Sequence, residues 1–276
     1  MATYGPMKEA VKKLLAKIAG KRRLQSIRHL VRSSALYDQP ASLCEPGSGE
    51  IAILAPHMDD EVLGCGGTIA RHVHAGANVV VIFLTDGRYG GWVDTTASRP
   101  TCDSGYRELV NIRKQEAQRA GEILGVRRIL FLDAEDTQLR ADRFVAGKLR
   151  DVLERERPDI VYLPFFLERH EDHRAVNDVL MAATAGTTLD FECRGYEVWT
   201  PLFPNCLVKI DQTIELKKRA LACYRSQLAV VDYLHAGVGL NAYRSLALAG
   251  SGCRFVEAFH ALTLTEYRRL HRVMSQ

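Results

Sequence analysis

Residues 51–61 read I-A-I-L-A-P-H-M-D-D-E, and this stretch decides the fold. Its first part predicts a buried strand, because strands that are covered on both faces are continuously apolar. His57 comes next, and after one further residue come three acids in a row, Asp59, Asp60 and Glu61. Like charges this close repel one another unless a positive charge holds them together. The stretch therefore indicates a strand end that needs a cation.

The chain beyond this strand alternates between apolar runs and helical patterns. After a first strand at 51–55, the expected elements are a helix at 62–75, a strand at 79–85, a helix at 106–124, a strand at 128–132, a helix at 142–156, a strand at 159–164 and a helix at 173–185. This alternation is typical of βαβ units, which build a parallel sheet with helices on both faces.

The alternation changes beyond residue 190. The sequence there predicts strands at 191–199, 206–210 and 256–264, a helix near 213–227, and a basic helix at the end of the chain. The stretch 236–252 is rich in Gly and Ala and matches no element.

The N-terminal part of the chain is strongly basic. Residues 1–34 contain nine Lys/Arg and one acid, whereas the whole chain has a net charge of +4. We expect residues 1–45 to form a basic helical arm and a linker, the linker being the Pro/Gly/Ser-rich stretch 38–49, and residues 46–276 to form one domain. The arm would be a surface helix pair or a mobile extension. The alternative is a peripheral membrane contact of residues 1–34 with anionic lipid.

Composition argues against several classes of protein. The seven cysteines are scattered without a C-x-x-C pair, which argues against a disulfide framework and against a thiolate zinc cluster. There is no secretory apolar region and no run near the roughly 20 apolar residues of a membrane span. No basic stripe interleaved with aromatics occurs, so nucleic acid is not an expected partner. We expect a cytoplasmic protein with a small-molecule substrate.

Polar residues follow the predicted strands at one edge of the sheet, where open parallel sheets bind their ligands. His57 and Asp60 follow the first strand, and the run F-F-L-E-R-H-E-D-H at 165–173 follows the fourth. His57, Asp60 and His173 would supply two imidazoles and a carboxylate, which is a ligand set for catalytic Zn²⁺ with an open position. A bound dication would also hold Asp59 and Glu61 ionised. The alternative is a strand-end loop whose acids cap the next helix.

Several motifs in order resemble one known family. They are A-P-H-M-D-D-E-V-L-G-C-G-G-T-I-A at 55–70, F-L-T-D-G at 83–87, a spaced R-E-A-L-G pattern over 113–125 and H-E-D-H-R-A-V-N at 170–177. Together they resemble the LmbE-like (PIG-L) zinc-dependent N-deacetylases over residues 50–180. The resemblance implies an α/β fold, a Rossmann-like three-layer sandwich with a mostly parallel sheet. It also implies one Zn²⁺ per chain and removal of acetyl groups from N-acetylated sugars.

The resemblance assigns a role to each matching residue. His57, Asp60 and His173 would be the zinc ligands, and Asp59 would be the general base. A protonated His170 would stabilise the oxyanion or protonate the leaving amine.

Three further roles follow from the same resemblance. Asp172 would orient a histidine of its own motif, and Arg113 and Asp136 would contact the sugar. Met58 and Glu171 stand where the family usually has proline, which leaves the ligands intact but changes the loops.

Other functions fit parts of the pattern. An amidase acting on a larger acyl group or a thiol conjugate would have the same motifs. Two histidines and a carboxylate also form the triad of non-haem Fe(II) oxygenases, and a non-catalytic metal- or sugar-binding protein could share the scaffold. For the substrate, four aromatics could stack on sugar rings or pack in the core, namely Tyr89, Trp92, Tyr106 and Tyr224. The long loop 86–105 is expected either to cover the site or to be a flexible excursion.

Overall fold

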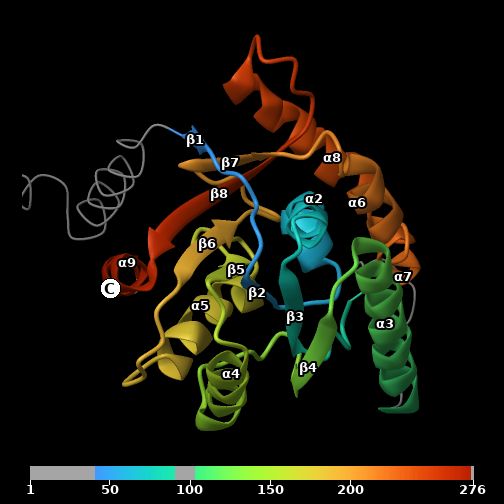
Figure 1. Cartoon of the computed structure of the whole chain (residues 1–276). Helices are drawn as coiled ribbons and strands as arrows, with labels where there is room; N and C mark the ends of the chain where they lie inside the picture. Colours follow the sequence, from blue (N-terminus) through green and yellow to red (C-terminus); the bar gives the residue numbers. More distant parts are fainter. Residues whose placement is uncertain (1–40, 91–102, 275–276) are drawn as a thin grey trace, which may run out of the picture. The chain divides into compact units, whose positions relative to one another are not determined.

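The computed structural model describes residues 41–90 and 103–274 (Figure 1). Residues 41–276 group into one compact unit. The basic arm, residue Trp92 and most of the loop predicted to cover the site lie outside the described residues.

The described residues form an eight-stranded sheet in the order β1-β7-β8-β6-β5-β2-β3-β4. Neighbouring strands are parallel, except that β8 runs antiparallel to both β6 and β7. The mostly parallel sheet that the sequence predicted is thus confirmed. The strands are β1 Ser42–Leu43, β2 Glu50–Ala55, β3 Asn78–Thr85, β4 Arg128–Ala134, β5 Ile160–Pro164, β6 Glu192–Tyr196, β7 Cys206–Lys209 and β8 Val256–Thr263.

The helices follow the predicted alternation as far as α5 and depart from the prediction after it. They are α2 Asp60–His74, α3 Asp103–Leu124, α4 Arg143–Glu156, α5 Glu171–Ala183, α6 Ile214–Leu221, α7 Arg225–Leu228, α8 Tyr233–Arg244, the 3₁₀ helix η2 Ser245–Leu248 and α9 Leu264–Met274. The single helix expected near 213–227 is wrong, since α6 and α7 are separate. The stretch 236–252 contains most of α8 and all of η2. Residues 42–43 form β1 inside the segment predicted as a linker.

Two apolar layers enclose the sheet, and β2 shows how. Ala52 and Leu54 point to the layer with α4, α5 and α9, whereas Ile51 and Ile53 point to the layer with α2, α3 and α6. All four side chains are buried, and full burial of an Ile or Leu side chain stabilises a fold by about 1.5–3 kcal/mol. Figure 1 shows these two groups of helices on opposite faces of the sheet, which confirms the three-layer sandwich.

The strand order places a switch point beside β2. From β2 the chain builds β3 and β4 on one side, and then returns to place β5 on the other side of β2. The loops after β2 and β5 therefore leave neighbouring strands in opposite directions, which opens a crevice at their carboxyl ends. Both predicted histidine clusters lie in these two loops and at the starts of the helices that follow, α2 and α5.

Helix α2 is kinked, and a buried ion pair bridges the kink. Cys65 has non-helical angles (φ −147°, ψ 21°) within the helix. The backbone N–H of Gly67 donates to Glu257 Oε1 (2.9 Å). Lys217 Nζ donates to the same oxygen (2.7 Å) and to the carbonyl of Leu63 (2.8 Å). Glu257 and Lys217 thus bond to backbone groups on both sides of the kink.

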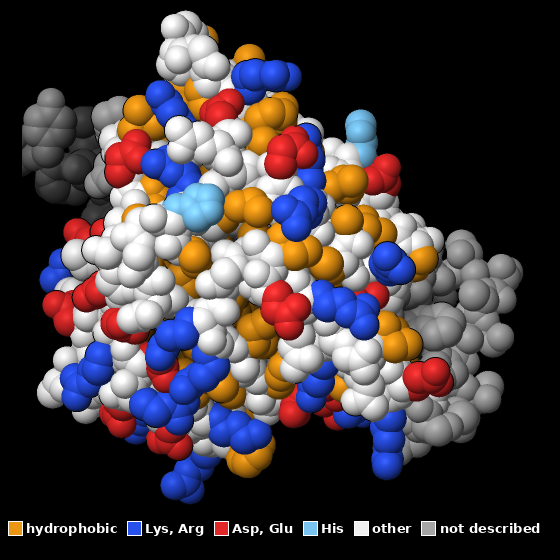
Figure 2. Space-filling model, turned by 45° about the vertical axis from the view of Figure 1, so that its right-hand side comes forward, with side chains coloured by type: hydrophobic (Ala, Val, Ile, Leu, Met, Phe, Trp, Pro, Cys, Tyr) orange, Lys and Arg blue, Asp and Glu red, His pale blue; other side chains and the backbone are white. Residues whose placement is uncertain are grey.

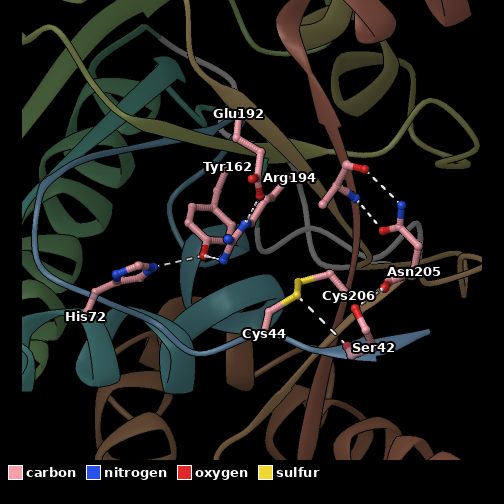
Figure 3. The surroundings of a disulfide bond; sticks show 9 residues. Ser42, Cys44, His72, Tyr162, Glu192, Arg194, Asn205 and Cys206 are labelled. Carbon is pink, nitrogen blue, oxygen red and sulfur yellow. Dashed lines mark hydrogen bonds and ion pairs between the residues drawn. A yellow bond between two sulfur atoms is a disulfide. The ribbon is translucent and has the colours of Figure 1, made fainter.

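One disulfide joins Cys44, just after β1, to Cys206 in β7, with a Cα–Cα distance of 5.6 Å (Figure 3). The parallel register, which pairs Ser42 with Cys206, brings the two cysteines together. This bridge is at odds with the expected reducing cytoplasm, since disulfides persist mainly in oxidising compartments.

A chain of buried hydrogen bonds lies near this bridge (Figure 3). His72 Nδ1 donates to the carbonyl of Gly47 (2.8 Å), so Nε2 of the neutral ring accepts from the Tyr162 hydroxyl (2.9 Å). The Tyr162 oxygen in turn accepts from Arg194 Nη1 (2.9 Å). Burial lowers the pKa of His72 to about 4, which matches its role as an acceptor.

The surface of the described residues mixes both charges. On the face drawn in Figure 2, basic and acidic side chains are interspersed among small apolar patches. In the described part of the chain, no helix has both the length and the apolar character needed to cross a bilayer.

Candidate active site and metal centre

Two histidines and one carboxylate converge at the switch point. Asp60 Oδ2 lies 3.2 Å from His57 Nδ1 and 3.3 Å from His173 Nε2. Ligand atoms about 2.0 Å from a tetrahedral zinc ion lie about 3.3 Å from one another. His173 is fully buried, and neither of its ring nitrogens has a hydrogen bond of good geometry. Asp60 Oδ2 thus lies at the ligand-to-ligand distance of a zinc site from one nitrogen of each histidine, and the three residues stay predicted ligands.

Carboxylates contact the second nitrogen of each of these rings. His57 Nε2 lies 3.1 Å from Asp136 Oδ1 and 3.1 Å from Asp172 Oδ2. His173 Nδ1 lies 3.4 Å from Glu168 Oε2. Carboxylates in this position accept the second N–H of a ligating histidine and fix its ring orientation. The sequence predicted that Asp172 orients a histidine of its own motif. In the structure its side chain instead contacts His57, which belongs to the loop after β2.

The surrounding acids favour a positive charge at this place. Burial opposes charge on His57, but hydrogen bonds to Asp136, Asp172 and Asp60 raise its pKa well above the ordinary value. Burial also opposes charge on His173, and the charge of Asp60 raises its pKa to about 9. The site thus favours the binding of either a proton or a metal ion. Either cation would offset the repulsion among the acids that follow β2.

Asp59, the predicted general base, lies in the same cavity as the predicted ligands. It precedes α2 in a backbone conformation that is rare for any residue with a side chain (φ 136°, ψ −28°). Its carboxylate lies 3.6 Å from Arg113 Nη2. Burial and the charge of Asp60 raise the pKa of Asp59 to about 7, and a bound dication would lower it again. A carboxylate with a pKa near neutrality suits proton transfer at pH 7.

Glu61 has a different role from the two aspartates. Its Oε2 accepts the backbone N–H of Asp59 (3.1 Å), and its Oε1 bonds to the Tyr224 hydroxyl. Burial raises the pKa of Glu61 to about 8. Glu61 thus bonds to Tyr224 and to backbone, and its ionisation by a bound dication stays a prediction. Glu61 supports the strained backbone of Asp59.

His170 stands beside the other two histidines. Its ring centroid lies 4.8 Å from that of His57 and 4.9 Å from that of His173. Its Nδ1 accepts the backbone N–H of Asp172 (3.2 Å), so it caps α5. Burial, followed by the charges on the other two histidines, lowers the pKa of His170. The geometry favours a neutral ring with its proton on Nε2, rather than the protonated ring expected from the sequence.

Two sets of donor atoms in the described residues lie close enough together to hold a metal ion, and neither includes Asp60. His57, His170 and His173 have ligand atoms within 4.8 Å of one another, as do His57, Asp136 and Asp172. The predicted set with Asp60 differs from both and rests on the contacts of Asp60 Oδ2 with the two imidazoles.

Arg113 and Asp136, the predicted sugar contacts, line the cavity but also hold its loops. Arg113 is 2% exposed, and it donates to the carbonyls of Gly87 (2.8 Å) and Met58 (2.9 Å). Asp136 Oδ2 accepts the backbone N–H of Tyr89 (2.9 Å). Contact with a sugar stays a prediction for both.

The cavity over these groups has a volume of about 250 Å³. The wall facing the predicted ligands comes from the last third of the chain, where the motifs give little guidance. It consists of Trp199, Gln227, Val230, Val231 and Tyr233.

The four aromatics expected at the substrate have different positions. Tyr89 lines the cavity, and Tyr106 lies outside it with its ring centroid 5.4 Å from that of Tyr89. Tyr224 is fully buried in the core, and Trp92 is not described. The sequence did not single out Trp199, which was only the last residue of the predicted strand 191–199.

Comparisons with known proteins bear on the family and the fold of the chain. A sequence model of a family described as PIG-L, GlcNAc-PI de-N-acetylase, matches residues 52–184. The diacetylchitobiose deacetylase of Thermococcus kodakarensis is 34% identical over 194 residues, which are 64% of this chain and 70% of that protein. The solved structure of N,N'-diacetylchitobiose deacetylase from Pyrococcus horikoshii, in complex with an inhibitor, has a TM-score of 0.65 at 25% identity. It covers 95% of this chain and 94% of that chain.

A further relative has another chemistry. The 4-oxalmesaconate hydratase of Pseudomonas putida is 30% identical over 109 residues, which are 40% of this chain and 41% of that protein. Similarity of fold alone therefore does not identify the reaction, which has to be inferred from the side chains of the site.

Proposed function

Because the chain belongs to the PIG-L family of GlcNAc-PI de-N-acetylases, we propose that it is a zinc-dependent hydrolase of N-acetylated amino sugars or their conjugates. Its products would be acetate and a free amine. One observation supports this most strongly: His57 and His173 share one oxygen of Asp60, and Asp59 lies next to them in the same cavity.

The metal would be held by His57, Asp60 and His173. Zinc bound there would supply Lewis acidity, which activates a water molecule and polarises the acetyl carbonyl.

Asp59 would take a proton from the attacking water as its oxygen bonds to the carbonyl carbon. Arg113, 3.6 Å away, and the Glu61 carboxyl that accepts its backbone N–H would hold Asp59 in place. The proton would then pass to the amine as the C–N bond breaks, because an amide nitrogen leaves only when it is protonated.

His170 would donate through Nε2–H. In the neutral ring, Nδ1 already accepts the Asp172 backbone N–H, so the single ring proton is on Nε2. This N–H would bond to the oxyanion that develops on the carbonyl. One such donor lowers the barrier by about 3 kcal/mol.

Asp59 also favours this hydrolase over the other candidates. A binding protein does not need a second buried carboxylate with a raised pKa beside the ligand set. A non-haem iron oxygenase needs further open positions for oxygen and co-substrate rather than a base. An amidase for larger acyl groups would use the same residues and would differ only in the size of the acyl group accepted.

The test is an acetate-release assay with the zinc-loaded protein over a panel of N-acetyl amino sugars. Asp59→Ala should keep zinc and lose most turnover, whereas His57→Ala and His173→Ala should lose zinc. Asp151→Asn, a change of an exposed acid on α4, is the control and should alter neither.

Three results would contradict the proposal. They are full activity of Asp59→Ala, loss of zinc from Asp59→Ala, and hydration of an unsaturated dicarboxylate without acetate release from any amide. The last result would instead favour the reaction of the hydratase relative.

A further inference from the structure

A second cavity continues from the first one past His170. It has a volume of about 420 Å³ and is lined by Thr137, Arg169, His170, Glu171 and Trp199. Thr137, His170 and Trp199 also line the catalytic cavity. A group attached to a sugar in the first cavity could therefore extend directly into the second.

The Trp199 segment, which lines the second cavity, is hydrogen-bonded to a buried carboxylate beside His173. The backbone N–H of Trp199 donates to Glu168 Oε2 (3.1 Å), and those of the two flanking residues donate to Glu168 Oε1 (2.7 and 3.3 Å). The same carboxylate lies 3.4 Å from His173 Nδ1. Glu168 is 2% exposed, so one buried carboxylate holds the Trp199 segment and contacts the ring of His173.

The segment of Thr137, which also lines the second cavity, is held in a similar way. The backbone N–H of Thr137 donates to Asp172 Oδ2 (2.7 Å), and that of Leu139 donates to Asp172 Oδ1 (3.2 Å). Asp172 is fully buried and lies 3.1 Å from His57 Nε2. Each segment thus reaches one of the two predicted metal-ligating imidazoles through one buried carboxylate. Such support is expected of a binding site rather than of an accidental hollow.

The side chains of the second cavity suit an uncharged ring. Trp199 is 51% exposed and is braced edge-on by Tyr233, with ring centroids 5.8 Å apart. A braced and exposed aromatic ring offers a flat apolar surface at low entropic cost. Arg169 can donate hydrogen bonds to the hydroxyl oxygens of a sugar, and Glu171 can accept hydrogen bonds from its hydroxyl groups. Arg169 and Glu171 give the lining one charge of each sign, so its formal charges do not select an anionic group.

We propose that this second cavity is a subsite for an uncharged sugar ring linked to the N-acetylated ring, with Trp199 as the residue that determines specificity. The inference rests on the proposed function and narrows it. The preferred substrates are neutral oligosaccharides of two or more rings. Single amino sugars and conjugates with an acidic group are poorer substrates.

The test compares three probes, namely N-acetylglucosamine, N,N'-diacetylchitobiose and N-acetylglucosaminyl malate. We expect kcat/KM to be at least about tenfold higher for the disaccharide than for the other two. Trp199→Ala should lower the ratio of disaccharide to monosaccharide kcat/KM about tenfold, mainly through KM, and Trp199→Tyr should restore most of it. Phe144→Ala removes an aromatic that is 66% exposed on α4, outside both cavities, and should leave the ratio unchanged.

Calorimetric binding of the disaccharide to zinc-loaded Asp59→Asn protein, with and without Trp199→Ala, separates the two proposals. Acetate release from all probes with equal kcat/KM, or an unchanged ratio in Trp199→Ala, would overturn the subsite and leave the deacetylase standing. Absence of acetate from every probe would overturn the proposed function. In that case, disaccharide binding that does not weaken in Trp199→Ala would reject the subsite as well.

Discussion

Removing one partner of the buried Lys217–Glu257 pair should strongly destabilise the protein. Both side chains are 0% exposed, and Lys217 Nζ has two acceptors, Glu257 Oε1 at 2.7 Å and the carbonyl of Leu63 at 2.8 Å. Lys217→Met would leave the Glu257 carboxylate buried with only backbone N–H donors. Breaking such a pair costs about 3–5 kcal/mol. At about 2–4 °C per kcal/mol for a domain of this size, Tm should fall by about 6–20 °C.

Urea denaturation and calorimetry would measure the free energy of unfolding and the Tm of this variant. The matched control is Lys218→Met, because Lys218 pairs with the exposed Glu215 on the same helix. Exposed pairs contribute at most about 1 kcal/mol, so this variant should stay near the wild type.

A double-mutant cycle tests whether the pair acts as a unit. Lys217→Met combined with Glu257→Gln should lose about 1–3 kcal/mol less than the sum of the two single variants, because the double variant buries no unpaired charge. If Lys217→Met costs less than about 1 kcal/mol, or if the losses add fully, the ion pair does not stabilise the kinked helix in this way.

Three further predictions concern pH, catalysis and redox state. In the unfolded chain His72 gains a proton near its ordinary pKa of about 6.5, whereas in the folded protein it does so only near pH 4. The neutral ring therefore stabilises the fold above about pH 6.5. This contribution, about 3 kcal/mol, is lost as the pH falls to 4. His72→Gln should therefore show a smaller drop in unfolding free energy between pH 7 and pH 4.5, and an equal drop would refute this. Tyr224→Phe removes the hydroxyl bonded to Glu61 and should lower kcat about tenfold with zinc content unchanged, whereas wild-type kcat would show that Glu61 needs no such support. Dithiothreitol should lower the free energy of unfolding of the wild type by about 2–5 kcal/mol but not that of Cys44→Ser, and equal responses would show that the bridge does not stabilise the fold.

The strands of the first half could be predicted because their apolar runs are continuous and lie between helical patterns. Strand β1 could not, because two residues in a Pro/Gly/Ser-rich stretch have no periodicity and pair with β7 only in the folded chain. The sequence also did not predict that β8 lies between β6 and β7 and runs antiparallel to both, because strand order depends on long-range pairing.

The site shows the same division. The positions of His57, Asp60 and His173 were predicted by their motifs, and the structure brings the three together. The contact of Asp172 with His57 spans 115 positions along the chain, and no local pattern records it. Trp199 has no motif either, and its place at the cavity depends on three backbone bonds to Glu168.

The backbone of Asp59, with a φ of 136°, affects how this protein would respond to selection. A side chain in such a conformation costs about 1–3 kcal/mol, and glycine adopts it without that penalty. Asp59→Gly should therefore raise thermal stability while it removes the proposed base. A directed-evolution campaign that scored heat resistance alone would tend to enrich inactive clones at this codon, and only a paired screen for turnover would keep the aspartate.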